Sequence, residues 1–227
     1  AIEMIHTSSL VHDDLPCMDD DMMRRGQAST WAEYGEDMGV LAGDALMIYA
    51  FEVAAKAFKE VSDADDLKRV GRAIEILASK TGIYGMIGGQ TVDVELAGGP
   101  IPKNKLDFIY RLKTGALIEA SMLIGAVLGG AAEEDCKIVE SLAGKVGLAF
   151  QIQDDILDVT STSEALGKPV LSDEKNQKTT YVTLVGLEQA KKNVEEISAR
   201  AVSLLKELPG NNAFLENLIA MLVERKK

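Results

Sequence analysis

The sequence predicts an all-α protein. Apolar residues recur at helical spacing over most of the 227 residues, and no segment of useful length alternates as a half-buried strand does. The apolar fraction is 47%, the aromatic fraction is 5%, and the five prolines stand mostly at the ends of the apolar repeats. This combination is typical of a globular helical protein.

The first predicted helix covers residues 1–14. Its apolar residues Ile2, Ile5 and Val11 keep a helical period from the start of the chain, and Ala1 is no capping residue. We therefore expect one domain over residues 1–227 that lacks its N-terminal portion. The same periodicity predicts further helices at about 37–60, 64–97 with a Gly-rich interruption, 103–129, 133–160, 187–207 and 211–225.

Proline and glycine interrupt this helical pattern. Pro100 and Pro102 separate two predicted helices, and Pro209-Gly210 separates the last two. Glycines within the 64–97 segment are expected to let another helix pack close to the backbone. They stand at positions 82, 85, 88 and 89. The stretch 161–177 is long and polar, which predicts a lid over a site, with an ordinary surface connection as the alternative.

Charge and composition narrow the possible partners. The chain has 36 acidic and 24 basic residues, a net charge of −12, which argues against nucleic acid. Exposed charges are screened over roughly 8 Å, so a local basic cluster still allows an anionic small substrate. The sequence has no signal peptide pattern and no apolar run of about 18 residues. We therefore expect a soluble, cytoplasmic protein without stable membrane insertion.

Two aspartate clusters, at residues 13–21 and 151–158, are the main functional signal. Each lies in or beside an apolar helical run, where an unpaired carboxylate is costly to bury. The second cluster lies on one helix face, because its polar residues stand at positions i, i+3, i+4 and i+7. They are Gln151, Asp154, Asp155 and Asp158. A cationic partner is therefore expected at both clusters.

Carboxylates without nearby His or Cys ligands suit a hard cation. Mg²⁺ fits best because it takes one or two carboxylates per ion together with water and phosphate oxygens. Neither cluster has the ligand spacing or the turn glycine of a calcium-binding EF-hand loop. The clusters therefore predict a Mg²⁺–phosphate site, and cations near them could complete it. These are Arg24, Arg25, Lys113, Lys168 and Lys178.

Several short motifs share the order and spacing of one enzyme family. They are Asp13-Asp14-xxxx-Asp19, Arg24-Arg25-Gly26, Gly43-Asp44, Gly89-Gln90-xx-Asp93, Lys113-Thr114-Gly115, Gln151-xx-Asp154-Asp155-xx-Asp158 and Gly167-Lys168. Over essentially the whole chain, these motifs resemble the trans-isoprenyl diphosphate synthases (polyprenyl synthetases) of the bacterial and plastid farnesyl/geranylgeranyl type. The resemblance implies the isoprenoid synthase fold, a helical bundle around a central cavity, and a homodimer.

The same resemblance implies the ligands of a diphosphate site. Asp13, Asp19 and Asp154 would hold three Mg²⁺ ions on an allylic diphosphate. The remaining metal-site residues, which would orient ligands and metal-bound waters, are Asp14, Asp155 and Asp158. The side chains expected to contact the allylic diphosphate are Arg24, Lys113, Thr114, Gln151, Lys168 and Lys178. Those expected to take part in catalysis are Lys113, Thr114, Gln151 and Lys168.

The implied activity is that of a trans-prenyltransferase (geranyltranstransferase or farnesyltranstransferase). It would condense isopentenyl diphosphate, held by Arg25, with an allylic diphosphate to give farnesyl or geranylgeranyl diphosphate. Ionisation of the allylic C–O bond leaves a carbocation, and Mg²⁺, Lys and Arg would stabilise the leaving diphosphate. Ser8 and Ser9, five and four positions before Asp13, are expected to face the growing product. The small side chain of Ser8 favours the longer, geranylgeranyl product.

Two alternatives remain open at this stage. A class I terpene cyclase ionises the same substrates, but low aromatic content and an Asp-rich second motif favour chain elongation. A non-catalytic partner subunit of a heteromeric prenyl synthase would tend to lose aspartates, and both clusters here are intact. The family's upstream isopentenyl-binding segment precedes the first residue of this chain. The chain is therefore expected to bind metal and allylic diphosphate but to condense poorly.

Overall fold

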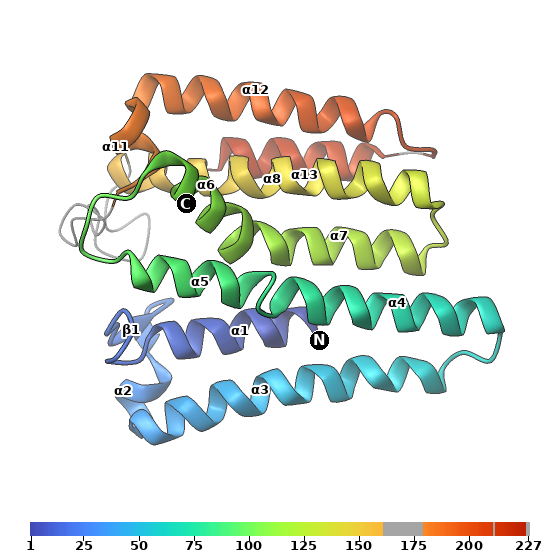
Figure 1. Ribbon diagram of the computed structural model, residues 1–227, viewed down its shortest axis with the longest axis horizontal. Coiled ribbons are helices and arrows are strands. Elements are labelled where there is room, and N and C mark those ends of the chain that lie inside the picture. Colours follow the sequence, from blue (N-terminus) through green and yellow to red (C-terminus); the bar gives the residue numbers. More distant parts are fainter. Residues whose placement is uncertain (161–178, 211, 226–227) are drawn as a thin grey trace. The chain divides into compact units, whose positions relative to one another are not determined.

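The computed structural model describes residues 1–160, 179–210 and 212–225 (Figure 1). In these ranges the regular structure is helical apart from one short hairpin, which confirms the predicted all-α class. The chain divides into two compact units, Ala1–Glu75 and Ile76–Lys227.

The first unit is built on two helices that pack along each other, α1 (Ile2–Asp13) and α3 (Glu36–Lys56). They approach closely at Gly43, where a Cβ atom would lie 2.1 Å from Nε2 of His12. Nε2 of His12 also lies 3.2 Å from the Val40 carbonyl oxygen, so His12 links the two helices. The remaining elements are β1 (Met23–Arg24), β2 (Gln27–Ala28), α2 (Thr30–Tyr34), η1 (Ala57–Lys59) and α4 (Ala64–Thr81), which continues into the second unit.

The second unit is organised around α8 (Glu133–Thr160), which packs against several other helices of that unit (Figure 1). Its neighbours are the π-helix η2 (Tyr110–Gly115), α7 (Ala116–Leu128), α11 (Tyr181–Val185), α12 (Leu187–Leu205) and α13 (Ala213–Glu224). Two further helices, α5 (Met86–Glu95) and α6 (Lys103–Ile109), pack against η2.

The central position of α8 follows from its sequence, because apolar residues occur on several of its faces. Leu142 and Ile152 are fully buried in two separate apolar clusters, one shared with α12 and α13 and one shared with α6, η2 and α11. Burying each such side chain stabilises the fold by about 1.5–3 kcal/mol. The second aspartate motif lies in the C-terminal part of α8, so it is carried by a helix that is buried on several faces.

Close backbone contacts fix η2 between α5 and α8. A Cβ on Gly89 would lie 2.2 Å from the Lys113 backbone nitrogen, and a Cβ on Gly147 would lie 2.7 Å from the Gly115 Cα. Gly89 is one of the glycines predicted to allow close packing, and the structure confirms that role. The position of the Lys113-Thr114 segment therefore depends on two glycines on neighbouring helices.

Most helix predictions are confirmed, and the differences are local. The 103–129 prediction corresponds to α6, η2 and α7, with a π-helical stretch that periodicity does not reveal. The Gly-rich interruption predicted within 64–97 is confirmed, because the helix breaks between α4 and α5 at Gly82 and Gly85. The short helices α2 and α11 and the hairpin were not predicted, because five or fewer residues carry no readable period. The candidate lid, 161–177, lies outside the described residues.

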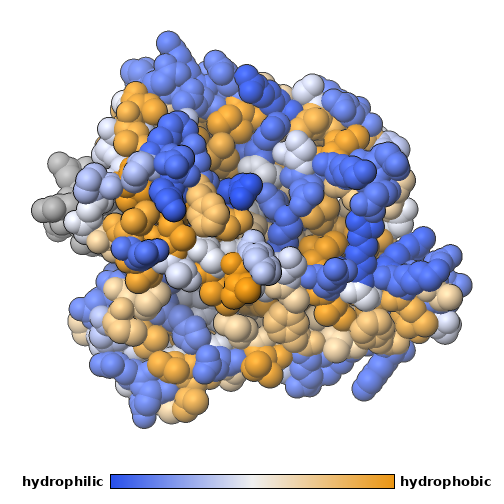
Figure 2. Space-filling model, viewed as in Figure 1, coloured by the Kyte–Doolittle hydropathy of each residue, from blue (hydrophilic) through white to orange (hydrophobic). Residues whose placement is uncertain are grey.

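Helix α3 departs from the expectation that no segment is long and apolar enough to cross a membrane. By length and composition alone, Glu36–Lys59 meets that description, with a mean hydropathy of 1.5 over an 18-residue stretch. Apolar residues occur among hydrophilic ones along α3, at the lower edge of the view in Figure 2. A core helix of a soluble protein also meets the description, so this is weak evidence for a membrane span.

Candidate functional site

The carboxylates of the second aspartate motif differ sharply in accessibility. The side chain of Asp154 is 47% exposed, whereas Asp155 and Asp158 are each 4% exposed. The predicted common face of α8 therefore lies at a boundary, with one carboxylate toward solvent and two toward the protein interior. An external cation would reach Asp154 more readily than the other two.

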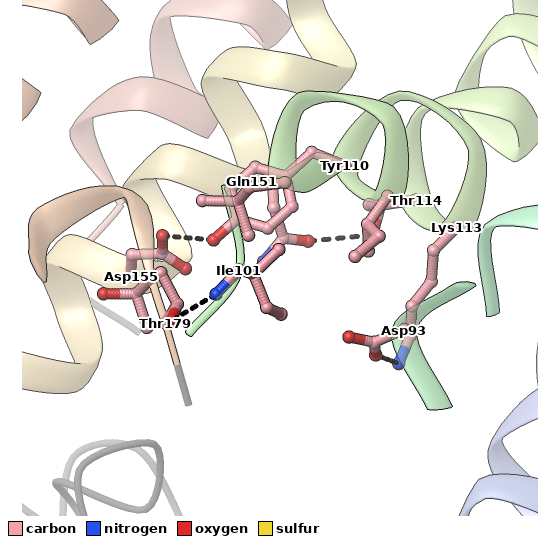
Figure 3. A pocket seen from close by; sticks show the side chains of 11 residues that line it. Asp93, Ile101, Tyr110, Lys113, Thr114, Gln151, Asp155 and Thr179 are labelled. Carbon is pink, nitrogen blue, oxygen red and sulfur yellow. Dashed lines mark hydrogen bonds and ion pairs between the residues drawn. The ribbon is translucent and has the colours of Figure 1, made fainter. Parts of the chain in front are cut away.

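Asp155 is held by two donors from different segments, of which Figure 3 shows Tyr110. The Tyr110 hydroxyl donates a hydrogen bond to Asp155 Oδ2 at 2.6 Å, and the Tyr181 backbone N–H donates to the same oxygen at 2.7 Å. Tyr110 lies at the start of η2 and Tyr181 at the start of α11. Hydrogen bonds of this kind offset the cost of burying a carboxylate.

Asp154 has a cationic partner from the end of the described chain. The Arg225 guanidinium donates from Nη2 to Asp154 Oδ1 at 2.5 Å and to the Phe150 carbonyl oxygen at 3.0 Å. It also lies over the Phe150 ring, 3.6 Å from the centroid. Burial lowers the pKa of Arg225, and the charge of Asp154 opposes that shift. Sequence inspection missed this partner because it follows 71 positions later, with no local spacing to reveal it.

Three residues predicted to contact diphosphate meet at one pocket of the second unit (Figure 3). Thr114 Oγ1 donates to Gln151 Oε1 at 2.8 Å, which joins η2 to α8. Lys113 Nζ lies 2.8 Å from Asp93 Oδ2 on α5. The pocket has a volume of about 110 Å³. It is lined by Asp93, Ile101, Leu106, Ile109, Tyr110, Lys113, Thr114, Gln151, Asp155, Thr179 and Thr180.

In the first unit, the two neighbouring aspartates of the first motif have different environments. Asp14 is 2% exposed and accepts hydrogen bonds at Oδ1 from Nε of Arg24, at 2.9 Å, and from its Nη2. The hydrogen bond to Asp14 raises the pKa of Arg24 against the opposing effect of burial. Asp13 is partly exposed and Asp19 is exposed. In this structure Arg24 forms an ion pair with the buried Asp14, whereas the sequence predicts that it contacts a diphosphate.

Arg25 stands at the tip of the β1–β2 hairpin in a backbone conformation that arginine seldom adopts. Its φ is +53°, and that of Gly26 is +79°. Two consecutive positive φ angles in a two-residue loop are the requirement of a type I′ turn, which favours Asn, Asp or Gly. The turn presents the exposed Arg25 side chain outward, at a conformational cost that a smaller residue would avoid.

The remaining predicted site residues either bond only to their own helix or lie outside the described residues. Ser8 is fully buried in the first unit, and its hydroxyl donates to the Ile5 carbonyl oxygen at 2.8 Å. Ser9 is partly buried and donates to the His6 carbonyl oxygen at 2.8 Å. Their role in facing a product stays a prediction. Lys168 and Lys178 lie outside the described residues.

The donor set fits a hard divalent cation that also uses ligands from a substrate. Within residues 1–160, 179–210 and 212–225, no group of three or more His, Cys, Asp or Glu residues could hold a metal ion alone. Asp154 offers an accessible carboxylate in the second unit, and Asp13 and Asp19 offer others in the first. Mg²⁺ needs few carboxylates when phosphate oxygens and water complete its octahedron.

The chain matches one protein family and several known proteins. The family model described as polyprenyl synthetase matches residues 1–210. The chloroplastic geranylgeranyl pyrophosphate synthase of Catharanthus roseus is 43% identical over 94% of this chain and 59% of its own length. The farnesyl diphosphate synthase of Escherichia coli (strain K12) is 41% identical over 100% of this chain and 76% of its own length.

A solved structure gives the same answer for the fold. The geranyltransferase of Helicobacter pylori, complexed with magnesium and isoprenyl diphosphate, superposes with a TM-score of 0.83 at 36% identity. The match covers 98% of this chain and 71% of that one. The predicted isoprenoid synthase fold is confirmed. The chain spans 59% and 54% of the length of two plant relatives. On the family match over residues 1–210, the chain belongs to the polyprenyl synthetase family.

Proposed function

We propose that this protein is a Mg²⁺-dependent trans-prenyltransferase. It condenses isopentenyl diphosphate with an allylic diphosphate and forms farnesyl or geranylgeranyl diphosphate through an allylic carbocation. The observation that carries the proposal is the meeting of Lys113, Thr114 and Gln151 at one pocket of the second unit. Terpene cyclisation and a non-catalytic subunit role are supported by no comparable observation.

The pocket residues supply charge and hydrogen bonds to a leaving diphosphate. Lys113 provides an ammonium group, which Asp93 holds at 2.8 Å. This charge is already ordered, so little reorganisation is needed when negative charge develops on the leaving oxygens. The Thr114 hydroxyl donates to Gln151 in this structure and would turn from it to donate to the diphosphate. Bound Mg²⁺ would supply further stabilisation of that charge as a Lewis acid.

The accessibility of the six aspartates supports a division of roles. The accessible carboxylates, Asp13, Asp19 and Asp154, suit direct ligation of up to three Mg²⁺ ions together with diphosphate oxygens. The buried ones suit an orienting role, because an ion from solvent would reach them less readily. They are Asp14, Asp155 and Asp158.

Three further expectations belong to this proposal. The two compact units form one isoprenoid synthase domain in a cytoplasmic protein. The exposed apolar residues Leu41 and Ile48 of α3, 59% and 71% exposed, support assembly as a homodimer, because a second copy would cover them. The small Ser8 supports a geranylgeranyl product over a farnesyl one.

Product analysis tests the proposed activity directly. The full-length protein is incubated with Mg²⁺, isopentenyl diphosphate and, in turn, dimethylallyl, geranyl or farnesyl diphosphate, and the products are identified by mass. We expect a prenyl diphosphate one or more isoprene units longer than the primer. Lys113→Gln should lower the rate by about 100-fold, whereas Lys137→Gln, at an exposed position of α8, should not. Absence of elongation with every primer would refute the proposal.

Arg25→Asn separates the function of the arginine from its conformational cost. Asn adopts positive φ more readily, so we expect the free energy of unfolding to rise by about 0.5–1 kcal/mol. The KM for isopentenyl diphosphate should rise at the same time, because the proposed cationic contact is lost. The matched change Arg200→Asn, in the regular helix α12, should lower stability slightly. Denaturant unfolding and steady-state kinetics measure both effects, and a less stable Arg25→Asn variant would contradict the turn argument.

A further inference from the structure

Tyr110 is a buried residue for which neither the motifs nor the proposed function supplies a role. It is 7% exposed and begins the π-helix η2, three positions before Lys113. Its hydroxyl donates to Asp155 Oδ2 at 2.6 Å. Both groups line the pocket that also contains Lys113 and Gln151 (Figure 3).

Asp155 Oδ2 is the point at which three segments of the second unit meet. Besides the bond from Tyr110, it accepts the backbone N–H of Tyr181 at 2.7 Å. Tyr181 directly follows Thr179 and Thr180, which line the pocket. Thr179 Oγ1 in turn accepts a hydrogen bond from the Ile101 N–H at 3.0 Å. The carboxylate therefore joins η2 and α8 to the segment that enters α11.

A second hydrogen bond repeats the link between η2 and α8 four residues away along each helix. Thr114 lies four positions after Tyr110, and Gln151 lies four positions before Asp155. The pairs Tyr110–Asp155 and Thr114–Gln151 thus bridge the two helices at two points. Two such links fix both the rotation of η2 and its position along α8. A π-helical turn is intrinsically uncommon and needs such support.

We propose that Tyr110 is a positioning residue for the diphosphate site. Its hydroxyl holds Asp155 and thereby sets the π-helical turn that carries Lys113 and Thr114 against the face of α8 that carries Gln151 and Asp154. This inference rests on the proposed function, because it assumes that a diphosphate binds at this pocket. In this role Tyr110 acts through Asp155, to which its hydroxyl donates.

The test compares two buried tyrosines that lose the same atom. Tyr110→Phe removes the hydroxyl that reaches Asp155. Tyr181→Phe removes a hydroxyl that accepts a hydrogen bond from Asn193 Nδ2 at 2.8 Å, and it keeps the backbone N–H that Asp155 accepts. Tyr181 is 6% exposed, so the two changes are matched in chemistry and burial. A general loss of stability would affect both variants alike.

The readout is the affinity for inorganic pyrophosphate at saturating Mg²⁺, measured by calorimetry, together with kcat and KM for the allylic substrate. Tyr110→Phe should weaken pyrophosphate binding and lower kcat/KM by about 10-fold, the size expected for one hydrogen bond to a charged group. Tyr181→Phe should change the affinity less than about two-fold, since the lost hydroxyl bonds Asn193 and the backbone N–H on Asp155 is kept. Unfolding of both variants is followed in parallel.

A double-mutant cycle identifies the route of the effect. If Tyr110 acts through Asp155, Tyr110→Phe should have no further effect on pyrophosphate affinity in an Asp155→Asn background. Additive effects, equal losses in the two tyrosine variants, or an unchanged Tyr110→Phe would each overturn the inference. So would a wild-type protein that does not bind pyrophosphate. If the wild type binds pyrophosphate but elongates no primer, the proposed activity fails while the binding comparison still decides the role of Tyr110.

Discussion

Replacing Asp154 by Asn is expected to lower kcat/KM for the allylic diphosphate by about 100- to 1,000-fold, the range for losing one preorganised charge-stabilising contact. Asp154 is the accessible carboxylate of its motif, so the loss falls on the proposed metal contact rather than on packing. Asn keeps an oxygen that can accept from Arg225, and the fold should therefore persist. Steady-state kinetics at several Mg²⁺ concentrations measures the change.

The matched control is Glu134→Gln, at an exposed position in the first turn of the same helix. Its effect should be confined to stability and should stay below about 1 kcal/mol, the usual limit for a charge near a helix N-terminus. Pyrophosphate affinity should fall in Asp154→Asn and remain unchanged in Glu134→Gln. If Asp154→Asn retained wild-type kinetics at low Mg²⁺, Asp154 could not be a metal ligand of the site.

Several of the aspartates already have partners within the protein. Burial predicts that each carboxylate needs a partner, and for several the protein supplies it. Arg24 pairs with Asp14, Arg225 pairs with Asp154, and Tyr110 donates to Asp155. Burial alone therefore does not require a metal. The case for Mg²⁺ rests on the accessible carboxylates, on the phosphate-binding charge of Lys113 at the pocket and on the family.

Sequence periodicity could predict the long helices because each repeats an apolar face over several turns. The 133–160 prediction coincides with α8, and that helix carries Gln151 and the second aspartate motif. The grouping of Lys113, Thr114 and Gln151 came from family motifs, since residues on different helices share no local spacing. Tyr110 and Arg225 could not be found in either way. Their partners lie 45 and 71 positions away, and only the folded chain brings such positions together.

Replacing Gly89 by Ala is expected to disturb both the stability and the site of the second unit. The new Cβ would lie 2.2 Å from the Lys113 nitrogen and 2.8 Å from the Leu112 carbonyl carbon. These are backbone atoms of η2, which cannot rotate away as a side chain end could. Overpacking of this kind typically costs about 1–3 kcal/mol, so we expect the free energy of unfolding to fall by about 2 kcal/mol. Denaturant unfolding measures it.

The control is Gly125→Ala, the same chemical change, for which we expect the free energy of unfolding to rise instead of fall. Gly125 lies in α7, and a Cβ atom added to it would meet no atom of the described residues within 4 Å apart from its chain neighbours and the nearby backbone of its own helix, so the methyl group should stabilise the helix by about 1 kcal/mol. Pyrophosphate affinity should fall in Gly89→Ala, because Lys113 and Thr114 move with the displaced backbone, and should not change in Gly125→Ala. Equal stability changes in the two variants would mean that α5 and η2 are not in close backbone contact. The position of the Lys113 ammonium would then need another explanation.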